Sequence, residues 1–260
     1  MLDYVISGPY RLDQDPIEAF NKSDESQGHE VIWYALYYDK AMGSTQKVAT
    51  SFNYSDYRAV NGGRDQNQRR CTWHQFTLSH SLLKQIGWMD NQLEVTSEAL
   101  ADKRYQQLYW RLEPYRGNDN DDPHFYDLQY KQVKTPQVYG DKYFRAPDGQ
   151  FSNVPVIRLA EMYLTRSIIH FKNGNNALAQ SDLNVVRTRA GLAPLQNITE
   201  DDIHNERIKE LAFEGDRLFY LQALSLPIPA GDRVGVAPIL PPYDGMYWKL
   251  PQRELDFKNN

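Results

Sequence analysis

The chain has 260 residues, of which 41% are hydrophobic, and this is enough to bury a core in one or two domains. Its formal net charge is −5 and no basic run stands out, which argues against a nucleic-acid partner. No apolar run approaches the roughly 20 residues that a membrane-spanning helix needs, and the opening residues Met1 to Tyr4 do not form a signal peptide.

The first 150 residues combine one predicted strand, two short helical segments and many turns. Glu30–Asp39 is rich in β-branched and aromatic residues, which favours a strand. Helical spacing occurs over Ser79–Gly87 and Glu98–Tyr109. We therefore expect ordered loops on a scaffold, which is where binding groups usually lie. Turn-forming residues gather in Asn21–Gly28, Asn61–Gly63, Gly117–Pro123 and Asp148–Gly149.

The segment Ser51–Trp73 supplies both kinds of side chain that a sugar requires. A sugar ring has an apolar face, which a flat aromatic ring buries, and an equator of hydroxyls, which polar side chains bond. Any single aromatic residue is nonetheless more often packed in a core with its polar tip satisfied. The same two interpretations apply to Trp88, Tyr109, Trp110, Tyr115 and Tyr126. The predicted ligand-binding residues are Asn53, Tyr54, Tyr57, Arg58, Asn61, Arg64 and Trp73.

Other patterns are weaker candidates for chemistry. Asn118–Asp122 resembles a calcium loop, but counting from Asp119 it lacks Gly at the sixth position and Glu at the twelfth, so we expect a solvated turn. The six His residues lack the paired helical spacing of a zinc site. Cys71 is the single cysteine and is expected to be a structural thiol. These patterns therefore predict no metal ion and no cofactor.

Two helices are predicted to form an antiparallel hairpin in the second half of the chain. Apolar or small residues within Val156–Phe171 recur at steps of three and four, which places them on one helical face. Pro155 suits the first helical turn, and Asn173–Gly174 suits the end. A second helix over Asn176–Arg189 is expected to stop at Gly191. The pair resembles a tetratricopeptide-type unit, although no second copy follows at a fixed period.

A third helix is predicted over Thr199–Leu221. The Thr199 hydroxyl can cap its N-terminus, and Asp202, three residues later, can reach back to the cap. Acidic residues in this first turn also suit the positive end of the helix dipole.

Charged residues occupy fixed places inside the apolar faces of these helices. Carboxylates four residues apart on one helix repel each other unless cations lie between them. An Arg guanidinium matches a carboxylate with two parallel hydrogen bonds. The spacing therefore predicts a structural ion-pair lattice, with a catalytic acid/base pair as the alternative. The residues concerned are Glu206, Glu210 and Glu214 on the third helix and Arg158, Arg187 and Arg189 on its neighbours.

Four ordered motifs in the last hundred residues resemble the C-terminal signature of the SusD/RagB family of outer-membrane nutrient-binding lipoproteins. Four motifs in order form a far more specific signal than one short pattern. The chain differs from the family's pattern at Arg217–Leu221. This stretch keeps the Arg but has fewer aromatic residues than the family's version. The motifs are Ile157–Leu164, Asp182–Leu192, Asn205–Arg217 and Tyr247–Leu255.

Fainter similarity to the same family continues upstream, so that the resemblance spans nearly the whole chain. It covers only the C-terminal half or so of a family member, because the signal peptide, the lipid-bearing Cys and most helical repeats have no counterpart here. The resemblance therefore implies that the chain is a C-terminal part. The upstream segments are Val5–Leu12, His29–Trp33, Phe76–Leu83 and Asp102–Tyr105.

The resemblance implies a mainly α fold. The expected architecture is a SusD-like alpha-alpha superhelix built from TPR-like helical hairpins, with long ordered loops and a few short strands. Residues 1–153 are expected to form the loop-rich, ligand-facing region, and residues 154–260 the helical signature region.

The resemblance also implies a binding function without chemistry. Such a protein captures a glycan or oligosaccharide at the surface of the cell outer membrane and passes it to a TonB-dependent transporter of the SusC type. No catalytic residues are expected, and the chain is not expected to be an enzyme. The physical task is reversible holding by stacking and hydrogen bonds of modest total strength.

Three other functions stay open at this point. A RagB-like protein would take up a peptide in place of a glycan. A glycoside hydrolase would need two carboxyl groups about 5–10 Å apart across an aromatic cleft, and a purely structural helical scaffold would bind no saccharide. The carboxylates that could be tried for hydrolysis are Glu30, Asp56, Asp65 and Glu113, which the sequence does not pair.

Overall fold

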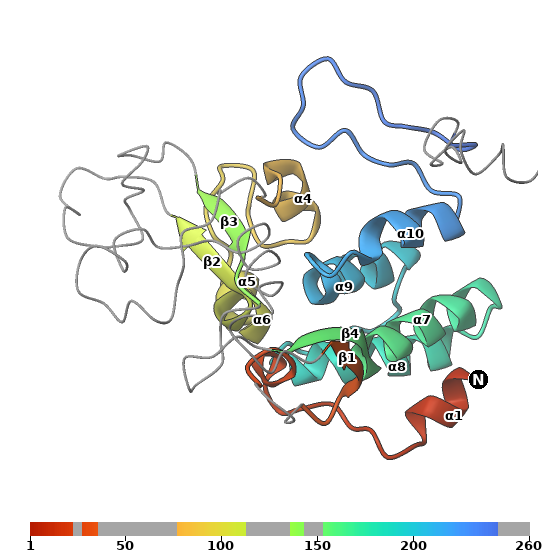
Figure 1. Ribbon diagram of the computed structural model, residues 1–260. Helices are drawn as coiled ribbons and strands as arrows, with labels where there is room; N and C mark the ends of the chain where they lie inside the picture. The colour runs from red at the N-terminus through yellow and green to blue at the C-terminus, as the bar shows by residue number, and fades with distance from the viewer. Residues whose placement is uncertain (23–27, 36–76, 113–135, 143–152, 244–260) are drawn as a thin grey trace, which may run out of the picture. The chain divides into compact units, whose positions relative to one another are not determined.

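The computed structural model describes residues 1–22, 28–35, 77–112, 136–142 and 153–243 (Figure 1). The chain divides into two compact units, residues 1–214 and residues 215–260. The described strands form two small antiparallel sheets of two strands each, and all other regular elements are helices. The prediction of a mainly α fold with few strands is therefore confirmed.

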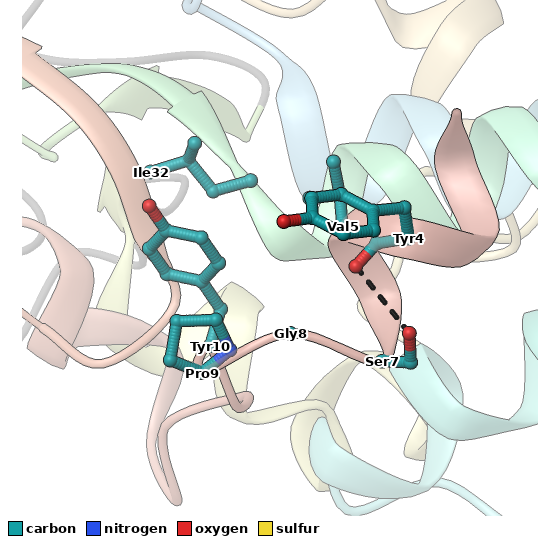
Figure 2. Close-up of a pocket in the computed structure, with 7 residues that line it drawn as sticks. All are labelled: Tyr4, Val5, Ser7, Gly8, Pro9, Tyr10 and Ile32. Carbon is teal, nitrogen blue, oxygen red and sulfur yellow. Dashed lines mark hydrogen bonds between the residues drawn. The ribbon is translucent and has the colours of Figure 1, made fainter.

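The first unit opens with a short helix that ends in a tight turn (Figure 2). After α1 (Leu2–Ile6), the Ser7 amide donates to the Asp3 carbonyl at 2.9 Å and the Gly8 amide donates to the Val5 carbonyl at 3.1 Å. A Cβ atom at Gly8 would lie 3.0 Å from that Val5 oxygen, so the close approach requires glycine or a shift of the chain. The chain then passes through the 3-10 helix η1 (16–19) toward the first strand.

Strand β1 (Val31–Ala35) confirms the predicted strand where it is described, and it pairs antiparallel with β4 (Val154–Arg158). This pairing contradicts the prediction that Pro155 opens a helix, because Pro155 lies opposite Tyr34 in the sheet. The β-branched residues of β4 suit a strand, and their partner lies so far away in the sequence that local spacing could not reveal it. The helix begins only after Arg158, which is its N-cap residue.

The middle of the unit holds short helices and the second sheet. Helix α4 (His80–Gln85) confirms the helical spacing predicted there, and the Ser79 hydroxyl caps it by accepting the Leu82 amide at 3.3 Å. Strand β2 (Tyr109–Leu112) pairs antiparallel with β3 (Gln137–Gly140).

The helical spacing over Glu98–Tyr109 is confirmed as helix, but the chain forms two short helices there. They are α5 (Ser97–Ala101) and α6 (Lys103–Gln107). The carboxylate of Asp102 accepts the Arg104 amide at 2.9 Å and so caps α6, while the backbone of Asp102 is extended. A local side-chain hydrogen bond therefore interrupts a helical pattern that the sequence shows as continuous.

The predicted helical hairpin is confirmed in its second helix and in both of its stops. Helices α7 (Leu159–Lys172) and α8 (Asn176–Arg189) pack against each other, and their facing apolar side chains form a buried cluster. Gly174 lies between them with a φ of 78°, and Gly191 follows α8 with a φ of 85°. Both backbone conformations are left-handed, as expected where a glycine ends a helix.

Helix α9 (Glu200–Leu211) begins as predicted. The Asp202 amide donates to the Thr199 hydroxyl oxygen at 3.3 Å, and the Thr199 amide donates to the Asp202 carboxylate at 2.7 Å, which completes a capping box. The helix also packs against α7. It therefore places its charged residues beside those of the hairpin.

The prediction that this third helix continues without a break to Leu221 is wrong. The helix ends at Leu211, and Phe213 and Gly215 adopt left-handed φ values of 68° and 84°. Two tertiary contacts outweigh the helical propensity: the Phe213 ring packs against the core, and the Glu214 carboxylate meets buried cations. A separate helix, α10 (Asp216–Ala223), belongs to the second unit.

The second unit is described as far as Tyr243. After α10 the chain is irregular, but Ile228 and Ile239 form a β-bridge with two backbone hydrogen bonds of 2.9 and 3.0 Å. The Tyr243 hydroxyl lies 2.9 Å from the Leu221 carbonyl oxygen and 2.6 Å from that of Leu226. These bonds fold the irregular segment back on α10.

The main core of the first unit collects apolar side chains from η1, β1, both strands of the second sheet, and helices α4, α5, α6 and α9. Trp88 is its largest fully buried side chain. Within the described ranges, no helix has the length and apolar character that crossing a membrane demands. The core members with no measurable exposure are Phe20, Leu83, Trp88, Ala99, Leu108 and Val138.

Candidate functional site

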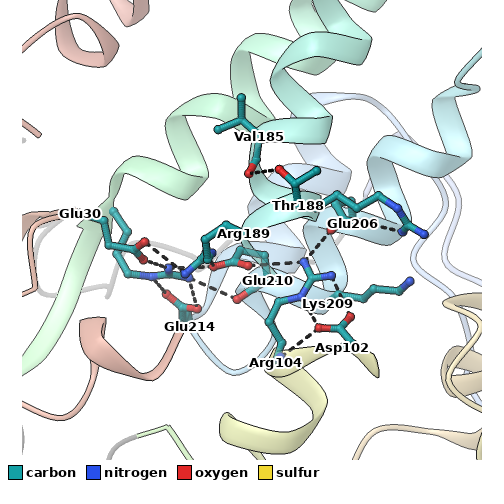
Figure 3. A network of polar contacts seen from close by, with 12 residues as sticks. Glu30, Asp102, Arg104, Val185, Thr188, Arg189, Glu206, Lys209, Glu210 and Glu214 are labelled. Atoms are coloured by element: carbon teal, nitrogen blue, oxygen red, sulfur yellow. Dashed lines mark hydrogen bonds and ion pairs between the residues drawn. The ribbon is translucent and has the colours of Figure 1, made fainter. Parts of the chain in front are cut away.

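A network of buried ion pairs centres on Glu210 of α9 (Figure 3). Glu210 has no solvent exposure, and its carboxylate lies close to three guanidinium groups. Arg158 and Arg189 donate to Oε1 at 2.9 and 2.6 Å, and Arg104 approaches Oε2 at 3.4 Å. Because these residues come from β4, α8 and α6, one carboxylate joins four elements of the fold.

Arg158 carries one half of this network. Its guanidinium donates to Glu30 at 2.5 Å and to both carboxylate oxygens of Glu214 at 2.8 Å. Lys142 shares Glu214 at 2.5 Å. The ring of Phe20 lies 5.0 Å from the Arg158 guanidinium and 5.2 Å from the Lys142 amine, within the range of cation–π attraction. This half therefore fixes the residue before β1, the residues after β3 and the end of β4.

Arg104 carries the other half and is also fully buried. It donates to the two carboxylate oxygens of Asp102 at 2.9 and 2.8 Å in a fork geometry, and it forms an ion pair with Glu206 at 2.7 Å. Arg187 of α8 reaches the same Glu206 at 3.3 Å. The network thus extends from α6 through α9 to α8.

The predicted ion-pair lattice is confirmed, including all three Arg residues and all three Glu residues of the prediction. The sequence did not reveal the partners that come from the first 150 residues, because they lie on separate segments with no common spacing. The sequence offered one signal: these charged residues have apolar or aromatic neighbours. A charged residue in such surroundings is usually buried only together with an oppositely charged partner. The missed members are Glu30, Asp102, Arg104 and Lys142.

Burial and neighbouring charges act in opposite directions on the buried carboxylates. Burial opposes ionisation of Glu214, but Arg158 and Lys142 outweigh it and hold the pKa of Glu214 below the ordinary value of 4.5. Burial is likewise outweighed at Glu210, whose pKa is held far below its usual range by the surrounding guanidinium groups. At Glu30 burial wins, and the pKa is raised.

We predict that Glu214→Gln lowers the free energy of unfolding at pH 7 by on the order of 1–3 kcal/mol, because two buried cations lose a charged partner. A carboxyl with a lowered pKa in the folded state contributes stability above its unfolded pKa, here about 4.5, and loses it as the pH falls further. The gap between wild type and variant therefore narrows below about pH 4.5. Urea unfolding followed by circular dichroism between pH 7 and pH 3 measures it.

The exposed carboxylate of Asp201, on the same helix, provides the control. Asp201→Asn leaves the buried network intact, so the variant follows the wild-type pH dependence. A gap for Glu214→Gln that stays constant or widens in acid would contradict the assigned direction of the Glu214 pKa.

The geometry favours a structural role over acid/base catalysis. A general acid must reach the proton acceptor of its substrate, whereas Glu210 is enclosed by three guanidinium groups. Glu30, one of the carboxylates considered for hydrolysis, is fully buried and held by Arg158. The other three, Asp56, Asp65 and Glu113, lie outside the described residues.

The predicted ligand-binding residues also lie outside the described residues, and so do the predicted calcium-like turn 118–122 and Cys71. The described residues on either side of the stretch 36–76 are paired with other segments of the chain. Ala35 of β1 pairs with Val154, and Thr77 forms a β-bridge with Tyr139. The residues concerned are Asn53, Tyr54, Tyr57, Arg58, Asn61, Arg64 and Trp73.

Two aromatic residues that the sequence left as ligand or core residues belong to the core. Trp88 is fully buried, and its ring meets Tyr105 at 5.1 Å and Tyr109 at 5.0 Å in edge-to-face geometry. The Trp88 indole N–H donates to Asp102 at 3.3 Å, and the Tyr109 hydroxyl donates to the Lys209 carbonyl at 3.0 Å. Each ring is buried with its polar tip satisfied, as the packing interpretation requires.

Comparisons with known proteins agree on one family. The sequence pattern that describes the SusD family matches residues 7–222. The Starch-binding protein SusD of Bacteroides thetaiotaomicron is 37% identical over 67 residues, which is 25% of this chain and 12% of that protein.

Solved structures share the fold. Surface glycan-binding protein A from Bacteroides thetaiotaomicron aligns with a TM-score of 0.61 at 18% identity, over 99% of this chain and 56% of that chain. Surface glycan-binding protein A from Bacteroides uniformis aligns with a TM-score of 0.54 at 23% identity, over 85% and 43% respectively. This chain therefore spans about half the length of the solved proteins that it resembles.

Proposed function

Because the chain belongs to the SusD family, we propose that it is a glycan-binding protein that holds an oligosaccharide without transforming it. The match of the family pattern over residues 7–222 carries this proposal. The shared fold with two proteins described as surface glycan-binding proteins supports it. The paired and buried state of the described Glu cluster supports binding over hydrolysis as well.

The proposed ligand contacts are the aromatic and polar residues of Ser51–Trp73. Stacked rings and hydrogen bonds of this kind hold a sugar with modest strength, so that the ligand can also leave. The described residues before and after the stretch 36–76 are held in place, since Ala35 lies in a sheet and the Leu78 amide donates to the Val138 carbonyl at 2.9 Å.

We also propose the cellular setting that the family suggests. The protein would act at the surface of the outer membrane and pass its glycan to a TonB-dependent transporter of the SusC type. A peptide ligand, as in RagB-like proteins, is the alternative. Co-purification of the transporter with the tagged protein from its native membrane tests the partnership, and recovery without any transporter would contradict it.

We predict that Trp73→Ala and Tyr54→Ala each weaken oligosaccharide binding about tenfold, because losing one stacked ring costs roughly 1–1.5 kcal/mol. A glycan array first identifies the ligand, and isothermal titration calorimetry then measures both variants. Phe219→Ala is the matched control, since Phe219 is an aromatic residue that is 72% exposed outside this segment.

The outcomes separate the candidate functions. Release of shorter sugars over time would establish a hydrolase. Binding of peptides and not of glycans would favour the RagB-like function. Absence of both saccharide and peptide binding by the wild type would leave only a structural scaffold. Unchanged affinity in both variants would show that the site lies elsewhere.

A further inference from the structure

A hollow of about 350 Å³ lies between helix α1 and strand β1, and it is separate from Ser51–Trp73 in the sequence. Figure 2 shows Tyr4 and Val5 on one side and Tyr10 and Ile32 on the other, with the Tyr4 hydroxyl directed across the gap. The turn Ser7–Pro9 closes one end. A volume at the lower end of small-molecule sites suits one or two sugar rings rather than a long chain.

The lining selects a neutral ligand with hydroxyl groups. None of the described lining residues carries a charged side chain, so among them neither an anion nor a cation finds an oppositely charged partner. Two phenol rings offer flat apolar faces. Among the described residues, no group hydrogen-bonds the hydroxyl of Tyr4 or Tyr10, and each phenol can donate or accept a hydrogen bond to a ligand. The Ser7 hydroxyl lies beside them, 3.4 Å from the Tyr4 carbonyl oxygen.

Helix α1, which carries one wall of the hollow, packs against helix α7. Asp3 of α1 forms an ion pair with Arg166 of α7 at 2.7 Å. The same guanidinium donates to both carboxylate oxygens of Asp182 in α8, at 2.8 and 2.7 Å. The helix that carries Tyr4 is therefore tied to the helical hairpin behind it.

The opposite wall is held by hydrogen bonds to the chain that precedes β1. The Arg11 amide, next to Tyr10, donates to the His29 carbonyl at 3.3 Å. The buried carboxylate of Asp13 accepts the amides of His29 at 2.9 Å and Glu30 at 3.2 Å. The backbone of this wall is therefore connected to the residues that lead into β1.

We propose that this hollow is a second carbohydrate subsite, in which a neutral sugar ring stacks between Tyr4 and Tyr10 and bonds their hydroxyls and that of Ser7. The subsite rests on the glycan-binding function proposed above and adds to it a site outside Ser51–Trp73. It binds neutral sugars and rejects uronic acids, since no cation is found among its described lining residues. A second contact point strengthens capture of a longer glycan only where both sites can be reached at once.

The test follows backbone amide shifts by NMR while maltotriose, xylotriose or trigalacturonic acid is added to the full chain. With a neutral trisaccharide we expect shifts at Ser7, Gly8, Tyr10 and Ile32 that persist in Trp73→Ala. Tyr10→Ala and Tyr4→Ala weaken this response about tenfold, since each removes a stacked ring. Trp33→Ala is the control, because Trp33 lies next to Ile32, is 60% exposed and does not line the hollow.

Each outcome bears on one proposal or on both. Sugar binding that leaves these amides unshifted, or that Tyr10→Ala leaves unchanged, overturns the second subsite while the glycan-binding function stands. An equal response to trigalacturonic acid overturns the selection for neutral sugars and with it the subsite as described. No response of any amide to either neutral sugar, with none on a glycan array, overturns both.

Discussion

Replacing Arg158 with Met is expected to lower the free energy of unfolding by about 3–5 kcal/mol, the largest effect of any single charge removal in the network. Arg158 is 1% exposed and donates to three carboxylates, those of Glu30, Glu210 and Glu214. Met has a similar length and fills much of the space. The loss therefore comes from leaving three carboxylates of the buried network without a shared cation and not from a cavity.

The free energy of unfolding falls because the carboxylates stay buried after the substitution and cannot be hydrated. Glu30 and Glu210 have no exposure. Burial raises the pKa of Glu30 even while Arg158 is present. Without that cation, the ionised form of the Glu30 carboxylate becomes still less favourable. Arg158→Lys keeps the charge but loses the fork of parallel hydrogen bonds, so an intermediate loss is expected.

Urea unfolding followed by circular dichroism at pH 7 measures the effect. Lys172→Met is the control, because Lys172 and Glu200 form an exposed ion pair at 2.6 Å, and such pairs contribute about 0–1 kcal/mol. Adding Glu214→Gln to Arg158→Met recovers part of the loss, which a double-mutant cycle quantifies. A loss below about 1 kcal/mol for Arg158→Met would show that the network is energetically neutral.

Much of the helical part of the fold could be predicted because its signals are local. Gly174 and Gly191 mark helix stops by their own backbone preference, and the Thr199–Asp202 capping box involves residues only three apart. The spacing of Glu206, Glu210 and Glu214 likewise indicates that cations must lie between them. Each of these signals can be seen within a few residues of sequence.

The errors occur where a distant segment decides the local structure. Val154–Arg158 has apolar residues that fit a helix or a strand, and pairing with β1 selects the strand. The third helix breaks at Phe213 because its ring packs on the core and the next residue reaches buried cations. Local spacing did not connect Arg104 and Lys142 to the Glu residues of the network, since Glu210 lies 106 residues after Arg104 and Glu214 lies 72 residues after Lys142.

The proposed ligand-binding residues could be predicted only from the amino-acid composition of their segment. Aromatic residues among polar neighbours are found both in binding loops and in cores, because Tyr and Trp bury a ring while bonding through a polar tip. Nothing in their immediate neighbours separates Tyr109 from Tyr54. The structure shows Tyr109 in the core, 2% exposed, and the assignment of Tyr54 to the ligand remains a proposal. The hollow beside Tyr4 and Tyr10 could not be predicted, since it forms only when α1 and β1 come together.

Trp88→Ala is expected to lower the free energy of unfolding by about 3–5 kcal/mol without changing the affinity of the folded protein for a glycan. Trp88 has no exposure and meets Tyr105 and Tyr109 edge-to-face, so its removal leaves a large cavity in the main core. Asp102, which caps α6 and holds Arg104, also loses the indole N–H that donates to it. Trp88→Phe keeps part of the ring contact and loses less.

Stability is measured by urea unfolding with far-ultraviolet circular dichroism, and affinity by calorimetry at a temperature where the variant stays folded. Trp33→Ala is the control, because an indole that is 60% exposed leaves no cavity, and such surface substitutions stay within about 0.5 kcal/mol. Trp73→Ala is expected to show the reverse of Trp88→Ala, with weakened binding and little loss of stability. If Trp88→Ala proved as stable as the wild type but bound glycan poorly, the division between core rings and ligand rings would be wrong, and Trp88 would belong to the binding surface.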